Sequence, residues 1–435
     1  MKTLEELGVK IPKILLPKNL EISTWATIAC DQYTQDRAYW NKVYSIVGSK
    51  PSTVKITFPE VYLPDPGRKE RINNIKQEMN NYIKKGIFSE PKESCVYLER
   101  TTKYGRIRKG LVVAVDLDTY EWKPFSKALI RATEATIVER IPPRMEIRRE
   151  AIIETPHIML LVNDPKNYLI EGLGQRVKKK NLLYEGNLMM NSGSVKGWEV
   201  SDEYDIEYMR VSLEKLAKEN TSPKDGSIFL FAVGDGNHSL ATAKATWEEY
   251  KKNHPGVKNC NMKYALIEIV NIYDTGLTFE PIHRVIFDIN SEDLINFLAQ
   301  KFEGNIEYLN DFDTLKNKVD NSKSDFGFIF VNNNNRTQYV YLKTDIKELP
   351  ISQLQPSIDE YLNYVNKKGN IDFIHGADEL CRLGNQKGTT AIYLPPINKD
   401  SFFATISTKG PLPRKSFSMG EADEKRFYLE CRQIV

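Results

Sequence analysis

The sequence has few of the residues on which metal and thiol chemistry depend. Among 435 residues there are 5 cysteines and 5 histidines. The cysteines form no CxxC pair and the histidines no HExxH or HxH pattern, which are the spacings typical of zinc sites. An odd number of scattered cysteines does not indicate a disulfide framework either. We therefore expect reduced thiols and no zinc hydrolase site.

Long apolar runs and an excess of one charge are also missing. No window approaches the roughly 20 apolar residues that a membrane-spanning helix needs, and the N-terminal MKTLEELGVKIPKILL lacks the features of a signal peptide. The chain has 61 Lys and Arg against 58 Asp and Glu, a formal net charge of +3, whereas binding a nucleic-acid backbone needs clustered cations. We expect a cytoplasmic protein that has small-molecule partners and binds neither membrane nor nucleic acid.

The composition is that of a folded protein, with 41% hydrophobic and 27% charged residues. Its length is enough for more than one structural unit. The pattern along the chain predicts four parts, which are an N-terminal α/β region at 1–125, a core at 126–289, a small α/β unit at 290–350 and a C-terminal segment at 351–435.

Several elements follow from periodicity. Apolar residues at three- and four-residue spacing predict a helix over 68–85, and 95–100 and 110–117 read as two strands joined by a polar turn. A hairpin over 182–200 and a helix over 202–218 follow. The clearest pattern is 227–252, where an apolar strand runs into a Gly-Asp-Gly turn and then a helix.

The turn at Gly234-Asp235-Gly236 is a candidate phosphate site. A helix that begins directly after a strand and a glycine turn presents free N–H groups with partial positive charge. Asn237, His238 and Ser239 would add polar side chains at its rim. The alternative, that Asp or Asn only caps the helix and His238 packs beneath it, is about as well supported. No Gly-Lys-Ser/Thr follows, so this is not a P-loop.

Three further segments carry chemistry-bearing side chains. In 129–150, Glu134 lies near several arginines, as a general base near a phosphoryl group would, although a surface segment is the simpler interpretation. In 409–426, Arg414, Lys415 and Ser416 could clamp a phosphate or form an exposed basic loop. His283 and Arg284 end an apolar strand and could bind phosphate, although such a pair is more often structural.

Together these segments resemble a prokaryotic family, the domain of unknown function 1015 family. Its members share a strand–DGHHR–helix box, an RxTE segment and a terminal PxKS segment. The matching residues here are Asp235-Gly236-Asn237-His238-Ser239, Arg131-Ala132-Thr133-Glu134 and Pro413-Arg414-Lys415-Ser416. Over about 128–250 the chain is also similar to the ParB/sulfiredoxin-like fold, which includes the free L-serine kinases. The resemblance implies an α/β (mixed α+β) protein with a ParB/sulfiredoxin-like core and additional small α/β units.

The resemblance also implies roles for individual residues. Glu134 would be the catalytic base, with Asp235 and His238 beside it, and Asp235 would hold Mg²⁺. The donor and substrate would be bound by a larger set: Arg131, Thr133, Gly236, Asn237, Ser239, His283, Arg284, Arg414, Lys415 and Ser416. Two positions depart from the box, where Asn237 replaces the first His and Ser239 replaces the Arg. Losing that Arg removes a phosphate clamp, which the 414–416 loop would replace.

The expected function is a small-molecule kinase. It would transfer a phosphoryl group from pyrophosphate or a nucleotide (ADP or ATP) to the hydroxyl of free L-serine, giving O-phospho-L-serine, or run the reverse reaction. A non-catalytic, ParB-like nucleotide-binding switch is the main alternative. A sulfiredoxin-like thiol reaction is a weaker one, because none of the five cysteines lies in the box.

Overall fold

The computed structural model describes residues 1–180, 182–258 and 260–434. The chain forms two units, Met1–Leu277 with Gly420–Val435, and Thr278–Met419. It therefore leaves the first unit, builds the second and returns to the first. The four-part division expected from the sequence stays a prediction, and the main sheet of the first unit takes strands from both sides of residue 125.

The first unit is built on a ten-stranded mixed sheet. Strands β10 and β14 are parallel, as are β13 and β8, while β10 and β13 are antiparallel. In spatial order the strands are β11 (Leu182–Asn187), β12 (Ser194–Val200), β5 (Cys95–Thr101), β6 (Ile107–Asp116), β14 (Tyr264–Asn271), β10 (Met159–Val162), β13 (Phe231–Asp235), β8 (Ile130–Ala132) and β7 (Tyr120–Glu121), with β1 (Val9–Lys10) paired to β6.

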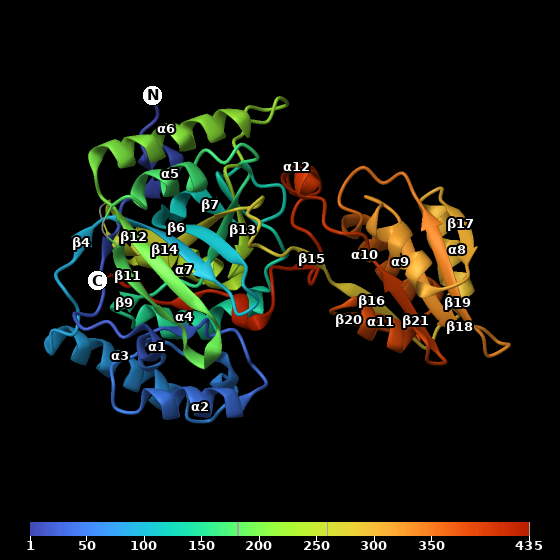
Figure 1. The fold of residues 1–435 in the computed structure, drawn as a ribbon, viewed down its shortest axis with the longest axis horizontal. Helices are drawn as coiled ribbons and strands as arrows, with labels where there is room; N and C mark the ends of the chain where they lie inside the picture. The colour runs from blue at the N-terminus through green and yellow to red at the C-terminus, as the bar shows by residue number, and fades with distance from the viewer. Residues whose placement is uncertain (181, 259, 435) are drawn as a thin grey trace. The chain divides into compact units, whose positions relative to one another are not determined.

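Helices cover both faces of this sheet (Figure 1). Side chains alternate between the faces of a strand, so in β5 Tyr97 joins one buried cluster and Leu98 the other. The first cluster includes α5 (Ile170–Val177), α6 (Glu203–Glu219) and α7 (Asn237–Asn253). The second includes α1 (Ile22–Trp25), α2 (Arg37–Val47) and α3 (Arg68–Lys84). The short helix α4 (Ile141–Arg149) contacts α7.

The elements expected from periodicity in this unit are confirmed. The helix over 68–85 is α3, and the helix over 202–218 is α6. The two strands at 95–100 and 110–117 are β5 and β6, which pair antiparallel. The hairpin over 182–200 is β11 and β12. The expected mixed α/β class is therefore confirmed, whereas the ParB-like core stays a prediction.

The second unit has a six-stranded sheet of its own. Its order is β17 (Asn305–Leu309), β19 (Thr337–Lys343), β18 (Phe326–Val331), β21 (Thr389–Tyr393), β16 (His283–Phe287) and β20 (Asn370–Ile374). The helices are α8 (Ser291–Lys301), α9 (Phe312–Asp320), α10 (Ile351–Glu360), α11 (Ala377–Gly384) and α12 (Lys399–Lys409). The segment 290–345 thus contributes three strands to a sheet that continues beyond it.

Among the described residues, four short strand pairs connect distant parts of the chain. They are β2 (Lys13–Ile14) with β4 (Lys92–Glu93), β3 (Thr27–Ile28) with β23 (Phe427–Tyr428), β9 (Ile153–Glu154) with β24 (Arg432–Gln433), and β15 (Glu280–Pro281) with β22 (Phe417–Ser418). The first three of them lie in the first unit and the last lies in the second. Among the helices of the described residues, none has both the length and the apolar character to cross a membrane.

Candidate functional site

The turn between β13 and α7 requires glycine at position 236. Gly236 has a φ of +82°, and a Cβ there would lie 3.1 Å from the Cα of Ile158. As the N-cap residue of α7 it provides no side-chain cap, so the first N–H groups of the helix face the turn with partial positive charge. The Asp235 carboxylate accepts the Gly236 N–H at 3.1 Å. It therefore lies at the rim of this positive helix end.

Strand β8 brings the RxTE segment to the same edge of the sheet. It runs parallel to β13 with Ala132 opposite Val233. The Thr133 N–H donates to the Asn237 Oδ1 at 3.3 Å, and the Thr133 hydroxyl donates to the Val233 carbonyl at 2.6 Å. Glu134 follows directly and is partly exposed. Two segments about a hundred residues apart in sequence are thus held together by hydrogen bonds.

His238 supports the other side of this arrangement. Its Nε2 accepts the backbone N–H of Ile137 at 3.2 Å. This bond fixes the segment between Glu134 and α4 against the first turn of α7. His238 is therefore placed where it holds the loop that carries Glu134.

Lys425 enters the site from the C-terminal segment of the chain. Its Nζ lies 3.4 Å from the Asp235 Oδ2, and both side chains are largely buried. The sequence singled out 409–426 for its Arg414-Lys415-Ser416 loop and missed this lysine. A cation near the return of the chain was the only signal available, and local pattern does not show which cation reaches the glycine turn.

A series of hydrogen-bonded side chains lies on the β10 side of the turn. His157 Nε2 is 2.8 Å from the Ser239 Oγ, and His157 Nδ1 is 2.9 Å from the Tyr428 Oη. The Cys30 N–H donates to the same Tyr428 oxygen at 3.1 Å, and the Asp31 Oδ2 lies 4.0 Å from the His157 Nε2. Burial raises the pKa of Tyr428 well above its usual value, so its phenol stays protonated.

Sequence reasoning missed His157 and Tyr428. The available signal for His157 is a histidine directly before the apolar run IMLLV, a run that by itself indicates only a buried strand. Tyr428 lies in β23, which pairs with β3 at the other end of the sequence. That pairing is too distant along the chain for a local pattern to reveal.

A cavity of about 150 Å³ lies beside Ser239. Within its walls, Arg144 Nε and Nη2 donate to the two Glu60 oxygens at 2.8 and 2.6 Å, and burial raises the pKa of Glu60. Cys30 also lines the cavity, and burial raises the pKa of its thiol. A thiol held in its neutral form is a poor nucleophile, which disfavours the sulfiredoxin-like alternative.

The acidic groups of the site fit a magnesium ion only if bound phosphates complete its coordination. Among the described residues there is no cluster of three or more His, Cys, Asp or Glu side chains suited to hold a metal. Mg²⁺ is commonly held by one or two carboxylates together with substrate phosphates and water. Asp235 is the carboxylate placed for this, at the turn where phosphates would bind.

The structure places Arg131 away from the glycine turn. Its Nε donates to the Ala128 carbonyl at 2.9 Å, and its guanidinium lies 4.6 Å from the centre of the Phe229 ring. Phe229 precedes β13, whereas the glycine turn follows that strand. Burial lowers the pKa of Arg131. These contacts hold the Arg131 side chain near the start of the β8–β13 pair, and its role in binding phosphate stays a prediction.

His283 and Arg284 lie inside the second unit. His283 is 4% exposed, stacks on Tyr393 at 4.5 Å and accepts the Leu394 N–H at its Nδ1. Burial lowers its pKa to about 3. Arg284 is fully buried and donates to the Gln355 Oε1, at 2.9 Å. Both side chains are held in the protein interior, so the structure does not present them to a phosphate.

The 414–416 loop also belongs to the second unit. Arg414 and Lys415 are exposed, and Lys415 has a φ of +55°. The Ser416 hydroxyl is buried and donates to the Pro413 carbonyl at 2.5 Å. Arg284 supports the loop by donating to the Lys415 carbonyl at 2.9 Å. The loop thus exposes two cations on a backbone that hydrogen bonds hold in place. Its role at the glycine turn stays a prediction.

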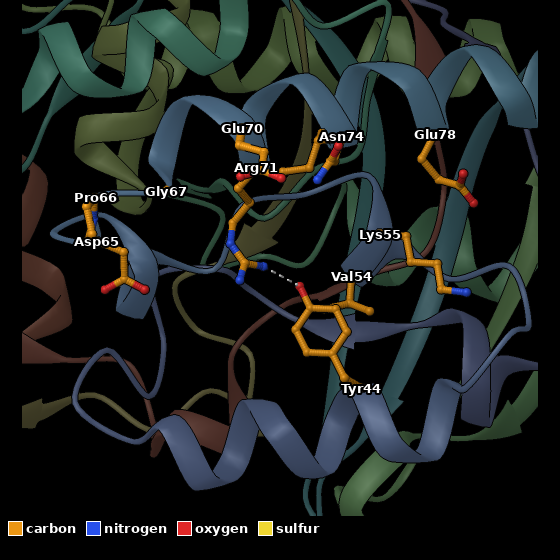
Figure 2. Close-up of a pocket in the computed structure, with 11 residues that line it drawn as sticks. Tyr44, Val54, Lys55, Asp65, Pro66, Gly67, Glu70, Arg71, Asn74 and Glu78 are labelled. Carbon is orange, nitrogen blue, oxygen red and sulfur yellow. Dashed lines mark hydrogen bonds between the residues drawn. The ribbon is translucent and has the colours of Figure 1, made fainter.

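A larger hollow of about 740 Å³ lies over α2 and α3 (Figure 2). Its lining mixes carboxylates such as Glu70 and Glu78 with Lys55 and Arg71, and Arg71 donates to the Tyr44 hydroxyl at 3.2 Å. None of the residues that line it belongs to the glycine turn or to the RxTE segment. Size alone therefore does not identify the site of chemistry.

Comparison with known proteins identifies a family and several distant structures, among them the following three. A family model described as "Protein of unknown function (DUF1015)" matches residues 13–361, and no curated protein matches the chain. A conserved hypothetical protein from Pyrococcus furiosus is similar at 10% identity and a TM-score of 0.34, covering 73% of this chain and 90% of that one. A free serine kinase in complex with AMP is similar at 9% identity and a TM-score of 0.36, with coverages of 74% and 91%. SbnI with a C-terminal truncation, from Staphylococcus aureus, is similar at 8% identity and a TM-score of 0.35, with coverages of 71% and 83%. Likenesses this distant assign no activity to the chain.

Proposed function

We propose that this chain, which belongs to the DUF1015 family, is a phosphotransferase that moves a phosphoryl group from pyrophosphate or a nucleotide to the hydroxyl of free L-serine. The acceptor comes from the sequence resemblance to free L-serine kinases. The reaction class is supported by the site itself. Phosphoryl transfer is catalysed mainly by positioning and by charge, and the site offers both.

One observation carries the proposal. The parallel pair of β8 and β13 places Glu134 at the same sheet edge as the glycine turn, and the Thr133–Asn237 hydrogen bond ties the two segments together. A carboxylate beside an uncapped helix N-terminus is the arrangement of a general base next to a phosphate site. Glu134 would take the proton of the acceptor hydroxyl.

The donor phosphates would bind at the N-terminus of α7. The N–H groups there and the Lys425 ammonium provide positive charge. If Mg²⁺ bound with the donor, Asp235 would be its carboxylate ligand, and the ion would neutralise charge on the phosphates. In that state Lys425 would turn from Asp235 toward the phosphates.

The proposal is tested by a screen of donors against acceptors. Purified protein with Mg²⁺ is offered pyrophosphate, ADP or ATP, each with L-serine, other free amino acids or polyols, and products are identified by mass spectrometry. We expect O-phospho-L-serine with at least one donor. Nucleotide binding without any phosphorylated product would favour the nucleotide-binding switch instead.

The substitution Glu134→Gln tests the role of the base. It keeps the size and hydrogen-bonding capacity of the side chain but removes the proton acceptor, so phosphoserine formation should fall about 10²- to 10⁴-fold while the melting temperature stays the same. The matched control is Glu139→Gln, because Glu139 is exposed in the following 3₁₀ turn, Val138–Arg140. Full activity of Glu134→Gln would contradict the assignment.

A further inference from the structure

We propose that Ser239 is a nucleophile that carries the phosphoryl group between donor and acceptor, with His157 as its general base. This inference rests on the proposed function, because it assigns the route that the phosphoryl group takes within the same site. It makes the transfer two steps through a phosphoseryl enzyme instead of one direct step.

The Ser239–His157 contact has the geometry of an activated nucleophile. A serine hydroxyl reacts when a base lies within hydrogen-bond distance and a third group orients that base. The Ser239 Oγ lies 2.8 Å from the His157 Nε2, and the other ring nitrogen, Nδ1, lies 2.9 Å from the Tyr428 Oη. All three side chains line the same 150 Å³ cavity. The serine is therefore within reach of a base whose ring is held on its far side.

Tyr428 is itself fixed, so it holds the ring of His157 in place. The backbone N–H of Cys30 donates to the Tyr428 oxygen at 3.1 Å, and β23, which contains Tyr428, pairs with β3. In the tautomer that carries its proton on Nδ1, His157 donates to the Tyr428 oxygen, and Nε2 can then accept the proton of Ser239. The Asp31 carboxylate, 4.0 Å from Nε2, then stabilises the imidazolium that forms.

Ser239 also lies where a donor phosphate would bind. It is the third residue of α7 and so belongs to the first turn, whose N–H groups face the phosphate site. At this position the DGHHR box has an arginine, which cannot act as a nucleophile. The serine thus adds a reactive oxygen at a point where the box has only a phosphate clamp.

The first step transfers the phosphoryl group from the donor to Ser239. The Ser239 Oγ attacks the terminal phosphorus of pyrophosphate or of a nucleotide, the Oγ–P bond forms, and the bond from that phosphorus to the bridging oxygen breaks. The serine proton moves to His157 Nε2, and phosphate or the shortened nucleotide leaves. In the second step Glu134 takes the proton of the acceptor hydroxyl, which attacks the phosphoserine. The bond between the phosphorus and the Ser239 Oγ breaks, and this oxygen takes back its proton from His157.

The test is the intact mass of the full-length protein after incubation with Mg²⁺ and a donor but no acceptor. Glu134→Gln should trap the intermediate, because it blocks only the second step, so the intact mass of this variant should rise by about 80 Da. Digestion of the same sample should locate the gain on a peptide that contains Ser239. Adding Ser239→Ala should abolish the gain. His157→Gln should slow the gain about 10²- to 10⁴-fold. The matched control Ser227→Ala, four residues before β13 begins, should leave it unchanged.

The outcomes separate this inference from the proposed function. If wild type forms phosphoserine while Glu134→Gln gains no mass and Ser239→Ala keeps its rate, the phosphoseryl enzyme is wrong and the kinase assignment stands. If the enzyme is labelled on Ser239 but no acceptor is phosphorylated, the nucleophile stands and the acceptor is wrong. Stereochemistry gives an independent check, because two displacements retain the configuration at phosphorus and a single direct transfer inverts it.

Discussion

Gly236 is the residue on which the geometry of the turn depends most directly. Its φ of +82° is unfavourable for any side chain, and a Cβ would also meet Ile158 at 3.0 to 3.1 Å. Gly226 has a comparable φ of +70°, but a Cβ there would have no heavy atom within 4 Å. The two glycines therefore separate backbone strain from steric contact.

We expect Gly236→Ala to lower the free energy of unfolding by more than Gly226→Ala. Strain alone costs of the order of 1 kcal/mol in both variants, while the clash with Ile158 adds to it only at 236 and moves the first turn of α7. Phosphotransferase activity should fall in Gly236→Ala and persist in Gly226→Ala. Chemical denaturation and the product assay measure the two effects. Equal stabilities would show that the contact with Ile158 relaxes without cost.

At the scale of elements, local sequence patterns predicted the helices and strands that can be recognised from neighbouring residues. The apolar run before Gly234 and the polar end of the following helix identify β13 and α7 without any knowledge of the rest of the chain. The same holds for α3, whose apolar residues recur at helical spacing. For Glu134, the resemblance named the residue. Its position beside Asn237, however, depends on the pairing of β8 with β13, which a local sequence pattern does not reveal.

The C-terminal segment is the element that local sequence could not place. It pairs with β3 and β9, and Leu15 bridges Cys431, so its partners lie hundreds of residues away. The burial of Arg131 and His283 is hidden from a local pattern for the same reason. Whether an arginine or histidine faces a ligand or the interior is decided by contacts that form only when distant segments meet.

A buried ion pair anchors this segment to the main sheet. Arg426 donates to the Glu268 Oε2 at 2.7 Å and also contacts Glu430, and all three side chains are at most 4% exposed. Burial raises the pKa of Glu268, but the charges of Arg108 and Arg426 outweigh this and hold the pKa below its usual value. Glu268 is therefore ionised in the folded protein.

We expect Arg426→Gln to lower the free energy of unfolding by about 3–5 kcal/mol, because it leaves buried carboxylates short of a cation. The control Arg37→Gln removes an exposed pair with Asp65 and should cost less than about 1 kcal/mol. Because the Glu268 pKa is lowered on folding, its contribution is lost as the pH falls through the folded pKa, so the difference between wild type and Arg426→Gln should narrow in acid. Urea denaturation at several pH values measures this.

At the scale of the whole molecule, the two units have separate sheets, and they bury different kinds of ionisable side chain. The first unit buries carboxylates paired with arginines, as at Glu268. The second buries a neutral histidine, because burial and, to a smaller extent, the charge of Arg284 lower the pKa of His283 to about 3. The unfolded chain binds a proton at this histidine near pH 6.5, whereas the folded unit does not. The second unit is therefore expected to respond to mild acid at a pH where the carboxylates of the first are still ionised.

Through His283, a falling pH is expected to lower the free energy of unfolding of the second unit. Its contribution to the stability of the second unit is fully present above about pH 6.5 and falls by about 1.4 kcal/mol for each pH unit from there toward pH 3. His283→Gln keeps an acceptor for the Leu394 N–H but does not titrate, so its stability should fall less steeply over the same range. Hydrogen exchange of peptides from β16, corrected for the intrinsic pH dependence and compared with peptides from β14, measures the slope in each unit. Equal slopes for wild type and His283→Gln would mean that the folded unit takes up the proton and that the ring is accessible after all.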